Sequence, residues 1–461
     1  MKKTARAMAL AAALAAFAAA GCRCGSGGGA DAAPGTDGGG GVDGGGGADG
    51  GGGADAAGDA SLPPSAACAP LPPPAGTVVM VTPAEADALP GIVAAAATGT
   101  TILLADGTYT MTGASESERR IQFGTPGVTM RSASGDRDAV VIDGEYLTNE
   151  IVTIFASDVT IADLTIRRAV DHPIHAYGAP AGVSGVVLHD LHIIDGGEQF
   201  VKVNSDGAGN WVDGGVLECS FLEMTPAGRT MVEPSPGGCY TGGIDAHGAW
   251  GWTVRDNVFR DIRCENGGLA EHAIHFWNGA RDTIVERNLI VDCARGVGFG
   301  LVETGTGNRT YTPDPYPGLG YVGHYDGIIR NNVIYATVSW FDTGIELDQA
   351  HGARVHHNTI VHPAAAFSSI DYRFANTLVE IRDNIVVNVT LRDGAAGTVE
   401  YNLETTDTSF YVDVPGLDFH LLPSAAAAID QGIVVIGAGT DIDGEDHTNG
   451  PPDLGADELW P

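Results

Sequence analysis

Lysine is nearly absent from this chain of 461 residues. Apart from Lys2 and Lys3, the only lysine is Lys202, and Lys and Arg together number 24 against 58 Asp and Glu. The formal net charge of −34 excludes nucleic acid as a partner, because proteins bind phosphate backbones with clusters of basic residues. It also repels any polyanion unless a groove is locally basic or calcium intervenes.

Long apolar runs are missing after residue 20, so no later segment is long enough to span a bilayer. The first residues are basic and then Ala-rich as far as Gly21, which is typical of a secretory signal. Ala19–Cys22 resembles a bacterial lipobox, so we expect Cys22 to be the lipidated mature N-terminus; ordinary cleavage after an Ala-x-Ala site is the alternative. The lipid would be the only membrane contact of an exported outer-membrane or cell-surface lipoprotein, which we expect to be a monomer.

Residues 22–75 are dominated by Gly, Ala and Asp and have almost nothing to bury. We expect them to form a disordered tether between the signal peptide (1–21) and the folded part.

Short strands recur along the rest of the chain, several of them 26 to 31 residues apart. The aligned segments are Ile161–Leu164, Val216–Cys219, Val254–Asn257, Val285–Asn288, Ile329–Asn332, Val355–Asn358, Ile381–Asn384 and Val399–Asn402. Six of them end in Asn. Asn is a common turn residue, but six in register favour a ladder in which each side chain hydrogen-bonds to the coils above and below.

This long period predicts an all-β solenoid, a right-handed parallel β-helix, over residues 76–415. A two-sheet sandwich is the alternative, but its turn signals recur every 8–12 residues without a longer period. Thr82–Glu85 is a capping box that predicts a helix as far as Ala97, covering the open N-terminal edge. Residues 416–461 are the predicted C-terminal cap.

The second strand of each coil carries a column of polar residues. Because strand residues alternate sides and neighbouring coils lie about 4.8 Å apart, the polar members should line one outer face. Rung by rung, that face is predicted to hold Lys202 and Asn204, Asp245 and His247, His275 and Trp277, Gly298 and Gly300, Glu346 and Asp348, and Asp371 and Arg373. The two glycines leave a bare rung where a ligand could approach the backbone.

Lys202 therefore lies mid-strand beside carboxylates and imidazoles. A lysine near other cationic groups can act as a base; the plainer interpretation is a snorkelling surface lysine. An aromatic, Pro/Gly-rich insertion over residues 302–325 flanks the face and suits stacking on sugar rings, or it simply decorates the coil. We expect substrate contacts from Asn204, Trp277, Arg373, Tyr316 and Tyr321.

The Asp106–Tyr109 D-G-T-Y turn, the Asn-ended coils and the lysine on a strand face together resemble pectate-lyase-like β-helix polysaccharide lyases, of the chondroitinase B and alginate lyase type. The resemblance implies β-elimination beside a uronate carboxylate, which a base, a charge-neutralising Ca²⁺ or amide, and an acid carry out. It makes Lys202 the base, puts Asp245 and His247 near the carboxylate or metal, and makes His275 the acid.

The predicted Ca²⁺ ligands are Asp245, Glu346 and Asp348. In that group the calcium ligands precede the lysine in the chain, whereas the carboxylates here follow it. Among the cysteines, Cys264 and Cys293 follow their coil asparagines by similar distances, so we expect adjacent coils to pair them in a disulfide.

Three functions remain open. A carbohydrate-active enzyme, above all a lyase acting on a polysaccharide or cell-surface glycan, predicts that Lys202, Asp245, His247 and His275 cluster and that a calcium site lies within about 5 Å, one rung, of them. A glycan-binding protein without catalysis predicts scattered polar groups with no strongly shifted pKa values. An adhesive or structural lipoprotein predicts no groove. Hydrolase and epimerase activities are less favoured, since the clustered Asp motifs of polygalacturonases are missing and only Asp245 and His247 resemble an epimerase site.

Overall fold

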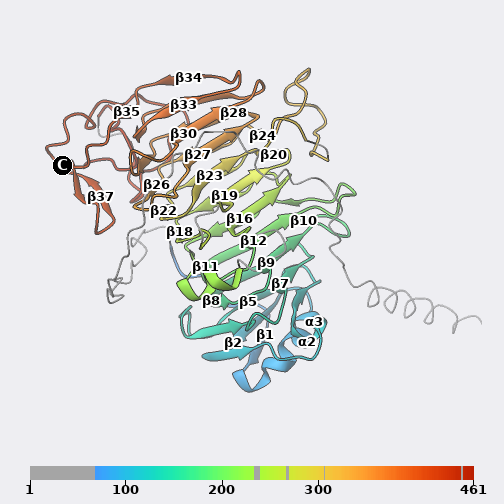
Figure 1. Ribbon diagram of the computed structural model, residues 1–461. Coiled ribbons are helices and arrows are strands. Elements are labelled where there is room, and N and C mark those ends of the chain that lie inside the picture. The colour runs from blue at the N-terminus through green and yellow to red at the C-terminus, as the bar shows by residue number, and fades with distance from the viewer. Residues whose placement is uncertain (1–67, 233–238, 266–268, 306, 448–449, 461) are drawn as a thin grey trace, which may run out of the picture. The chain divides into compact units, whose positions relative to one another are not determined.

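The computed structural model describes residues 68–232, 239–265, 269–305, 307–447 and 450–460. These residues wind into a stack of coils built from short parallel strands, with the chain running from one end of the stack to the other (Figure 1). The predicted fold class, a right-handed parallel β-helix, is confirmed. The predicted signal peptide, the lipidation of Cys22 and most of the tether lie outside the described residues.

Each coil contributes strands to three columns. The first column is β1 (Thr77–Val81), β2 (Thr100–Leu104), β5 (Thr129–Ser132), β8 (Thr160–Arg167), β11 (Val187–Ile194), β14 (Val216–Glu218), β17 (Thr253–Arg255), β21 (Ile284–Glu286), β25 (Ile328–Arg330), β28 (Ala350–His356), β31 (Leu378–Arg382) and β34 (Ala396–Glu400). The second is β3 (Gly107–Thr110), β6 (Val140–Asp143), the C-terminal halves of β8 and β11, β15 (Phe221–Glu223), β18 (Val258–Arg260), β22 (Leu289–Val291), β26 (Val333–Tyr335), β29 (Thr359–Val361), β32 (Ile385–Val386) and β35 (Leu403–Glu404).

The third column is a separate ten-stranded sheet, called the site sheet below. In order along the stack it consists of β4 (Ile121–Phe123), β7 (Glu150–Ile154), β9 (His172–Tyr177), β12 (Gln199–Asn204), β16 (Gly242–His247), β19 (His272–Trp277), β23 (Arg295–Phe299), β27 (Thr343–Asp348), β30 (Ser368–Arg373) and β33 (Val389–Leu391). Its inward residues, such as Ile244, Ile274 and Val297, are fully buried in the core that all three columns enclose.

The remaining elements are short. They are β10 (Val183–Ser184), β13 (Val212–Asp213), β20 (Ala280–Arg281), β24 (His324–Tyr325), the antiparallel pair β36 (Tyr411–Asp413) and β37 (Asp418–Leu421), the 3₁₀ helix η1 (Pro83–Ala88), and the α-helices α2 (Leu89–Ala94), α3 (Glu116–Arg119) and α4 (Pro226–Val232). No helix among the described residues has the length and apolar character needed to cross a membrane.

The predicted asparagine ladder is present at the turn between the first and second columns. Each Asn donates its Nδ2 hydrogen to the Oδ1 of the Asn in the next coil, at 2.8–3.0 Å, along Asn257, Asn288, Asn332, Asn358, Asn384 and Asn402. The residue before each Asn has a positive φ, from 51° to 59°, and the side chain satisfies backbone groups that this turn leaves unpaired.

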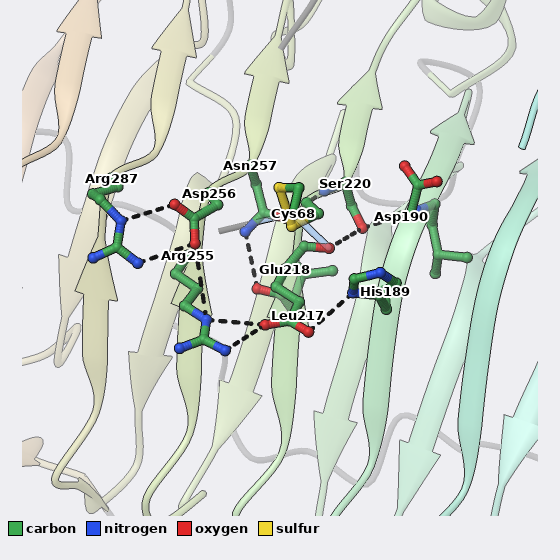
Figure 2. Close-up of a disulfide and its surroundings, with 12 residues drawn as sticks. Cys68, His189, Asp190, Leu217, Glu218, Ser220, Arg255, Asp256, Asn257 and Arg287 are labelled. Atoms are coloured by element: carbon green, nitrogen blue, oxygen red, sulfur yellow. Dashed lines mark hydrogen bonds and ion pairs between the residues drawn. A yellow bond between two sulfur atoms is a disulfide. The ribbon is translucent and has the colours of Figure 1, made fainter. Parts of the chain in front are cut away.

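In one coil the structure places the ladder position one residue later than the sequence predicts. Val216 pairs with Thr253, so Ser220, not Cys219, stands at the ladder position beside Asn257. Figure 2 shows this part of the stack, where Asn257 also donates to the carbonyl of Leu217 at 2.9 Å. Cys219, freed from the ladder, forms a disulfide with Cys68 and so ties the beginning of the described chain to mid-stack.

The predicted Cys264–Cys293 disulfide is wrong. Cys264 pairs with Cys239, which lies in the insertion after α4, and Cys293 keeps a buried thiol. Adjacent coils do place residues at equivalent positions side by side, but Cys264 belongs to the longer connection that precedes β19, which meets the insertion instead. The Cys239–Cys264 bond thus fastens two loops that lead into the site sheet.

The N-terminal segment follows the capping-box prediction in part. Glu85 accepts hydrogen bonds from the Thr82 amide and hydroxyl at 3.0 and 2.8 Å, and Leu89 and Val93 are buried in the core. The expected single helix is divided into η1 and α2 and ends at Ala94 rather than Ala97.

The C-terminal segment lies along the side of the stack, which corrects its prediction as an end cap. Its Leu421 and Leu454 pack with Val333 and Ile385 of the second column. It runs back past several coils, since Arg354, Arg330 and Arg287 donate to residues 436, 437 and 440 in turn. Among the described residues, β33, β34 and β35 have no strand beyond them.

The ladder predicts that an Asn→Ala substitution destabilises the fold more at a buried ladder position than at its partly exposed end. Asn332→Ala removes a side chain that donates to Val285 O at 3.0 Å and accepts from the Asn288 amide at 3.0 Å, both buried. Leaving such groups unpaired costs about 3 kcal/mol in total, to be measured by urea unfolding. In the matched Asn402→Ala variant, at the partly exposed end of the ladder, the free energy of unfolding should fall by only about 1 kcal/mol. Equal losses in the two variants would contradict the idea that the ladder stabilises the fold by pairing buried polar groups.

The cysteine pattern predicts selective labelling. Burial raises the pKa of the Cys293 thiol, and the thiolate is the reactive form, so iodoacetamide should leave Cys293 unmodified in the folded chain and modify it in urea. Peptide mapping without reduction should recover Cys239 and Cys264 in one linked pair. A disulfide-linked Cys264–Cys293 peptide would instead support the pairing predicted from the sequence.

Candidate active site on the outer face of the site sheet

The site sheet brings the predicted polar residues together in the predicted register. Lys202 pairs with Asp245, Asp245 with His275, and His275 with Gly298. Beyond Gly298 the same line continues to Glu346. Residues from β12 to β27 thus form one row along the stack.

Lys202, Asp245 and His247 make a compact cluster. The Lys202 ammonium donates a hydrogen bond to Asp245 Oδ2, and its Nζ lies 3.2 Å from His247 Nε2. His247 Nε2 is also 3.0 Å from the same Asp245 oxygen. The Lys202 side chain is 10% exposed and that of His247 is 21% exposed, against 2% for Asp245. His247 is therefore the member that solvent or a ligand reaches most easily.

The other carboxylate oxygen of Asp245, Oδ1, is contacted by residues of the neighbouring strand β19. Trp277 Nε1 donates to Asp245 Oδ1 at 2.9 Å, and His275 Nδ1 lies 3.5 Å from that oxygen. The Trp277 ring stacks on His275 at 5.7 Å between ring centroids and meets His247 edge-on at 4.5 Å. All four predicted catalytic side chains converge, but His275 is 1% exposed and is a positioning residue, too deep to contact a substrate.

The protonation states follow from these contacts. Burial opposes ionisation of Asp245, but Lys202 and then His247 hold its pKa well below the usual range. Burial, and next the Lys202 charge, lower the pKa of His247. At neutral pH the cluster therefore consists of a carboxylate, its lysine partner and a neutral imidazole. His247 Nε2 can either accept from Lys202 or donate to Asp245, and the tautomer that donates to Asp245 carries its lone pair at Nδ1, to which no described residue hydrogen-bonds.

A second polar column runs beside the first and was missed from the sequence. It includes Glu150, His172, Gln199, His272 and Arg295. Strict alternation points His272 into the core, but Ala273 and Ile274 are both fully buried, so the strand bends and His272 faces outward. The cluster of Glu271, His272 and His275 in the segment E-H-x-x-H was the available signal.

The bare rung at Gly298 is filled. The His272 ring lies where a side chain at position 298 would stand, 2.8 Å from its Cβ position, and its Nε2 reaches Glu346 Oε2 at 3.0 Å. Gly300 accepts a hydrogen bond from His275 Nε2 through its carbonyl oxygen at 2.9 Å. No open backbone remains there for a ligand.

The predicted calcium ligands do not form one site. Two strands lie between the rungs of Asp245 and Glu346. Arg373 instead donates from Nε and Nη2 to the two carboxylate oxygens of Asp348, each at 2.7 Å, and from Nη2 to Glu346 at 2.8 Å. Glu346 and Asp348 do lie close to Asp371, but Arg392 binds both oxygens of Asp371.

Calcium prefers six to eight oxygen ligands. Arginine and histidine donors already engage these carboxylates, so the described residues do not fit Ca²⁺ at the predicted positions.

The predicted substrate contacts mostly serve the protein itself. Asn204 Oδ1 accepts a hydrogen bond from His175 Nε2 at 2.5 Å, and Arg373 forms ion pairs with Glu346 and Asp348. Tyr316 donates to Asp326 and packs against Tyr325 and His351. Burial raises the pKa of Tyr321 to about 12, and its ring packs over Gly305. Of these predicted residues, Trp277 alone borders the cluster directly.

Comparison with known proteins supports the fold. No family model matches the sequence, and no curated protein matches it. Among solved structures, pectate lyase Pel9A has a TM-score of 0.56 and 13% identity, covering 84% of this chain and 97% of its own. PfbA, a surface adhesin of Streptococcus pneumoniae, covers 70% and 86% with a TM-score of 0.43 and 9% identity. Polygalacturonase from Erwinia carotovora ssp. carotovora covers 73% and 98% with a TM-score of 0.42 and 10% identity.

The likeness to Pel9A shows a shared β-helix fold. At 13% identity it concerns the fold alone.

Proposed function

We propose that this protein is a carbohydrate-active enzyme, a polysaccharide lyase that cleaves uronate-containing glycan by β-elimination. The observation that carries the proposal is the convergence of Lys202, Asp245 and His247 on one face of the site sheet, with a neutral imidazole as the most exposed member. Shifted titratable groups around one cluster are typical of active sites, which supports an enzyme over a glycan-binding protein without catalysis. The proposal rests on this site rather than on the names of proteins with a similar fold.

The geometry changes the role that the resemblance gave to Lys202. A lysine ion-paired with a buried carboxylate has no lone pair with which to take a proton. His247 is the better base, because a neutral imidazole held by a carboxylate can accept a proton at its other nitrogen. Lys202 then supplies positive charge to the uronate carboxylate as negative charge develops there, without any need for calcium.

The reaction balances with these groups. His247 Nδ1 takes the proton beside the carboxylate, the electron pair forms the new carbon–carbon double bond, and the bond to the leaving glycosidic oxygen breaks. The imidazolium formed at His247 is the nearest acid for that oxygen. Asp245 is a positioning residue that holds both Lys202 and His247.

Export and anchoring complete the proposal. The Cys68–Cys219 and Cys239–Cys264 disulfides are typical of exported proteins. A lipid on Cys22 and the Gly-rich tether would hold the enzyme at the cell surface, where polysaccharide is available.

Glycan binding without catalysis is the second candidate, favoured by a different surface. The exposed side chains of Leu269, Trp340 and Phe367 line a hollow of about 510 Å³ beside the beginnings of β27 and β30. Exposed aromatic rings at a groove suit sugar stacking. If this candidate holds, Lys202 variants bind polysaccharide as the parent does and no variant forms product.

Substitution of Lys202 distinguishes a role as the base from a role as the positive charge that faces the uronate carboxylate. A panel of uronate polysaccharides would be incubated with the full chain, and the unsaturated product followed in the ultraviolet. Lys202→Met and His247→Ala should each lose about 10²–10⁴-fold in kcat/KM. Lys202→Arg should retain more activity than Lys202→Met if the charge matters, whereas a lysine base predicts that both are equally inactive. His192→Gln, on another face of the stack, is the control for loss of a histidine.

The pH profile follows from His247. Its pKa lies below the ordinary 6.5, so the base is neutral at pH 7 and is lost only when the pH falls through that lowered value. The groups that face His247 are Lys202, Asp245 and His275. Burial opposes ionisation of Asp245, but Lys202 holds its pKa well below the usual range; burial also opposes the charged form of His275, but Glu271 raises its pKa. The acid limb of kcat/KM should therefore lie below pH 6.5 and disappear in His247→Ala. An acid limb above pH 7 would contradict this assignment.

A further inference from the structure

Three buried side chains beside the Lys202 cluster have no direct part in the reaction proposed above. Glu271, His272 and His275 are 9%, 1% and 1% exposed. Each offers one ligand atom, and these atoms all lie within 4.8 Å of one another. Glu271 Oε2 is 3.2 Å from His275 Nδ1 and 3.7 Å from His272 Nδ1, so both rings turn the same nitrogen toward one carboxylate oxygen.

The other nitrogen of each ring is already committed. His272 Nε2 donates to Glu346 Oε2 at 3.0 Å, and His275 Nε2 donates to the Gly300 carbonyl at 2.9 Å. Because both partners are acceptors, each Nε2 carries the hydrogen, and a neutral ring has its lone pair at Nδ1. In the neutral form of both rings, two lone pairs therefore face the Glu271 carboxylate, whose pKa is held well below its usual range although burial opposes its ionisation.

These atoms lack hydrogen bonds to satisfy them. Among the described residues, Glu271 Oε2 and His272 Nδ1 have no hydrogen-bond partner. The nearest arginine, Arg295, donates from Nε to Ala270 O and from Nη1 to Glu346, and its Nη2 lies 3.9 Å from Glu271 Oε2, beyond hydrogen-bond distance. Buried polar atoms without partners are rare and call for an explanation.

Extra protons explain the arrangement poorly. Protonating both rings puts two positive charges on imidazoles whose centroids are 4.6 Å apart. Protonating one leaves the Nδ1 of the other facing the carboxylate without a hydrogen. A single cation between the three atoms satisfies all of them at once.

We propose that Glu271, His272 and His275 bind a divalent transition-metal ion of the zinc type. Zinc bonds of about 2.0–2.2 Å in a tetrahedron separate neighbouring ligand atoms by about 3.4 Å, a value between the observed 3.2 and 3.7 Å. Imidazole nitrogen suits Zn, Cu, Fe and Ni rather than calcium. Glu346 and the Gly300 carbonyl act as the outer acceptors that orient metal-binding imidazoles.

The site differs from the calcium site predicted from the sequence in its residues, its ligand chemistry and its place. It lies in the segment that enters β19, close to Asp245, whose Oδ1 is 3.5 Å from His275 Nδ1. Three protein ligands leave a fourth position for water or for Asp245 itself. The contacts that point to a metal ion here do not depend on which reaction the Lys202 cluster carries out.

Metal titration of the full chain tests the proposal. After treatment with a chelator and dialysis, the protein would be titrated with Co²⁺ and with Zn²⁺, following the visible Co²⁺ spectrum, the metal content and the melting temperature. We expect one equivalent bound per chain, a tetrahedral Co²⁺ spectrum that Zn²⁺ displaces and Ca²⁺ does not, and a higher melting temperature with metal.

Variants locate the site. His272→Ala and Glu271→Gln should each weaken binding at least about 100-fold and abolish the metal-dependent rise in melting temperature; Glu271→Gln keeps the side-chain shape if His272→Ala folds poorly. His420→Ala is the control, because His420 with Asp443 and Asp457 is another group of metal-binding type. Failure of the folded parent to bind Zn²⁺ or Co²⁺, unchanged binding in both site variants, or loss of binding in His420→Ala would overturn the proposal.

Discussion

The register of the site sheet is the constraint on which the rest of this structure depends. Parallel pairing with neighbours about 4.8 Å apart converts sequence separations of 19 to 48 residues into direct contact. Lys202 and Asp245 are 43 residues apart and hydrogen-bonded. A slip of one residue in any strand would turn the polar row into the core and the core residues outward, and the asparagine ladder and the apolar interior together resist that slip.

Burial makes that row chemically different from an ordinary charged surface. Asp245, Glu271 and Glu346 are nearly inaccessible, and isolated charges at such depth are costly. The structure offsets the cost by setting a cation or an imidazole beside each carboxylate: Lys202 and His247 at one end, Arg295 and Arg373 at the other. Even where two carboxylates lie on neighbouring strands, as Glu346 and Asp371 do, each has an arginine of its own.

Within that network the groups divide into two kinds. His247 and Lys202 keep some exposure and belong to the proposed reaction, whereas Glu271, His272 and His275 are enclosed and suit a bound ion. Asp245 joins the two, with one oxygen turned to Lys202 and the other to Trp277 and His275. The Cys239–Cys264 disulfide fastens the loops that lead into β16 and β19, the strands that carry most of these residues.

The sequence by itself determined the coil, because the repeat, the six asparagines and the alternation of apolar residues are local patterns that one winding satisfies. It also determined which residues share the main polar row, since register follows from pattern. Only the tertiary structure decided the second polar column, because a bend places Ala273 and Ile274 both inward. It likewise decided the pairing of Cys264, the lateral docking of the C-terminal segment and the capture of Arg373 by Asp348. Each of these depends on which distant surfaces meet, and no periodicity within a strand encodes that meeting.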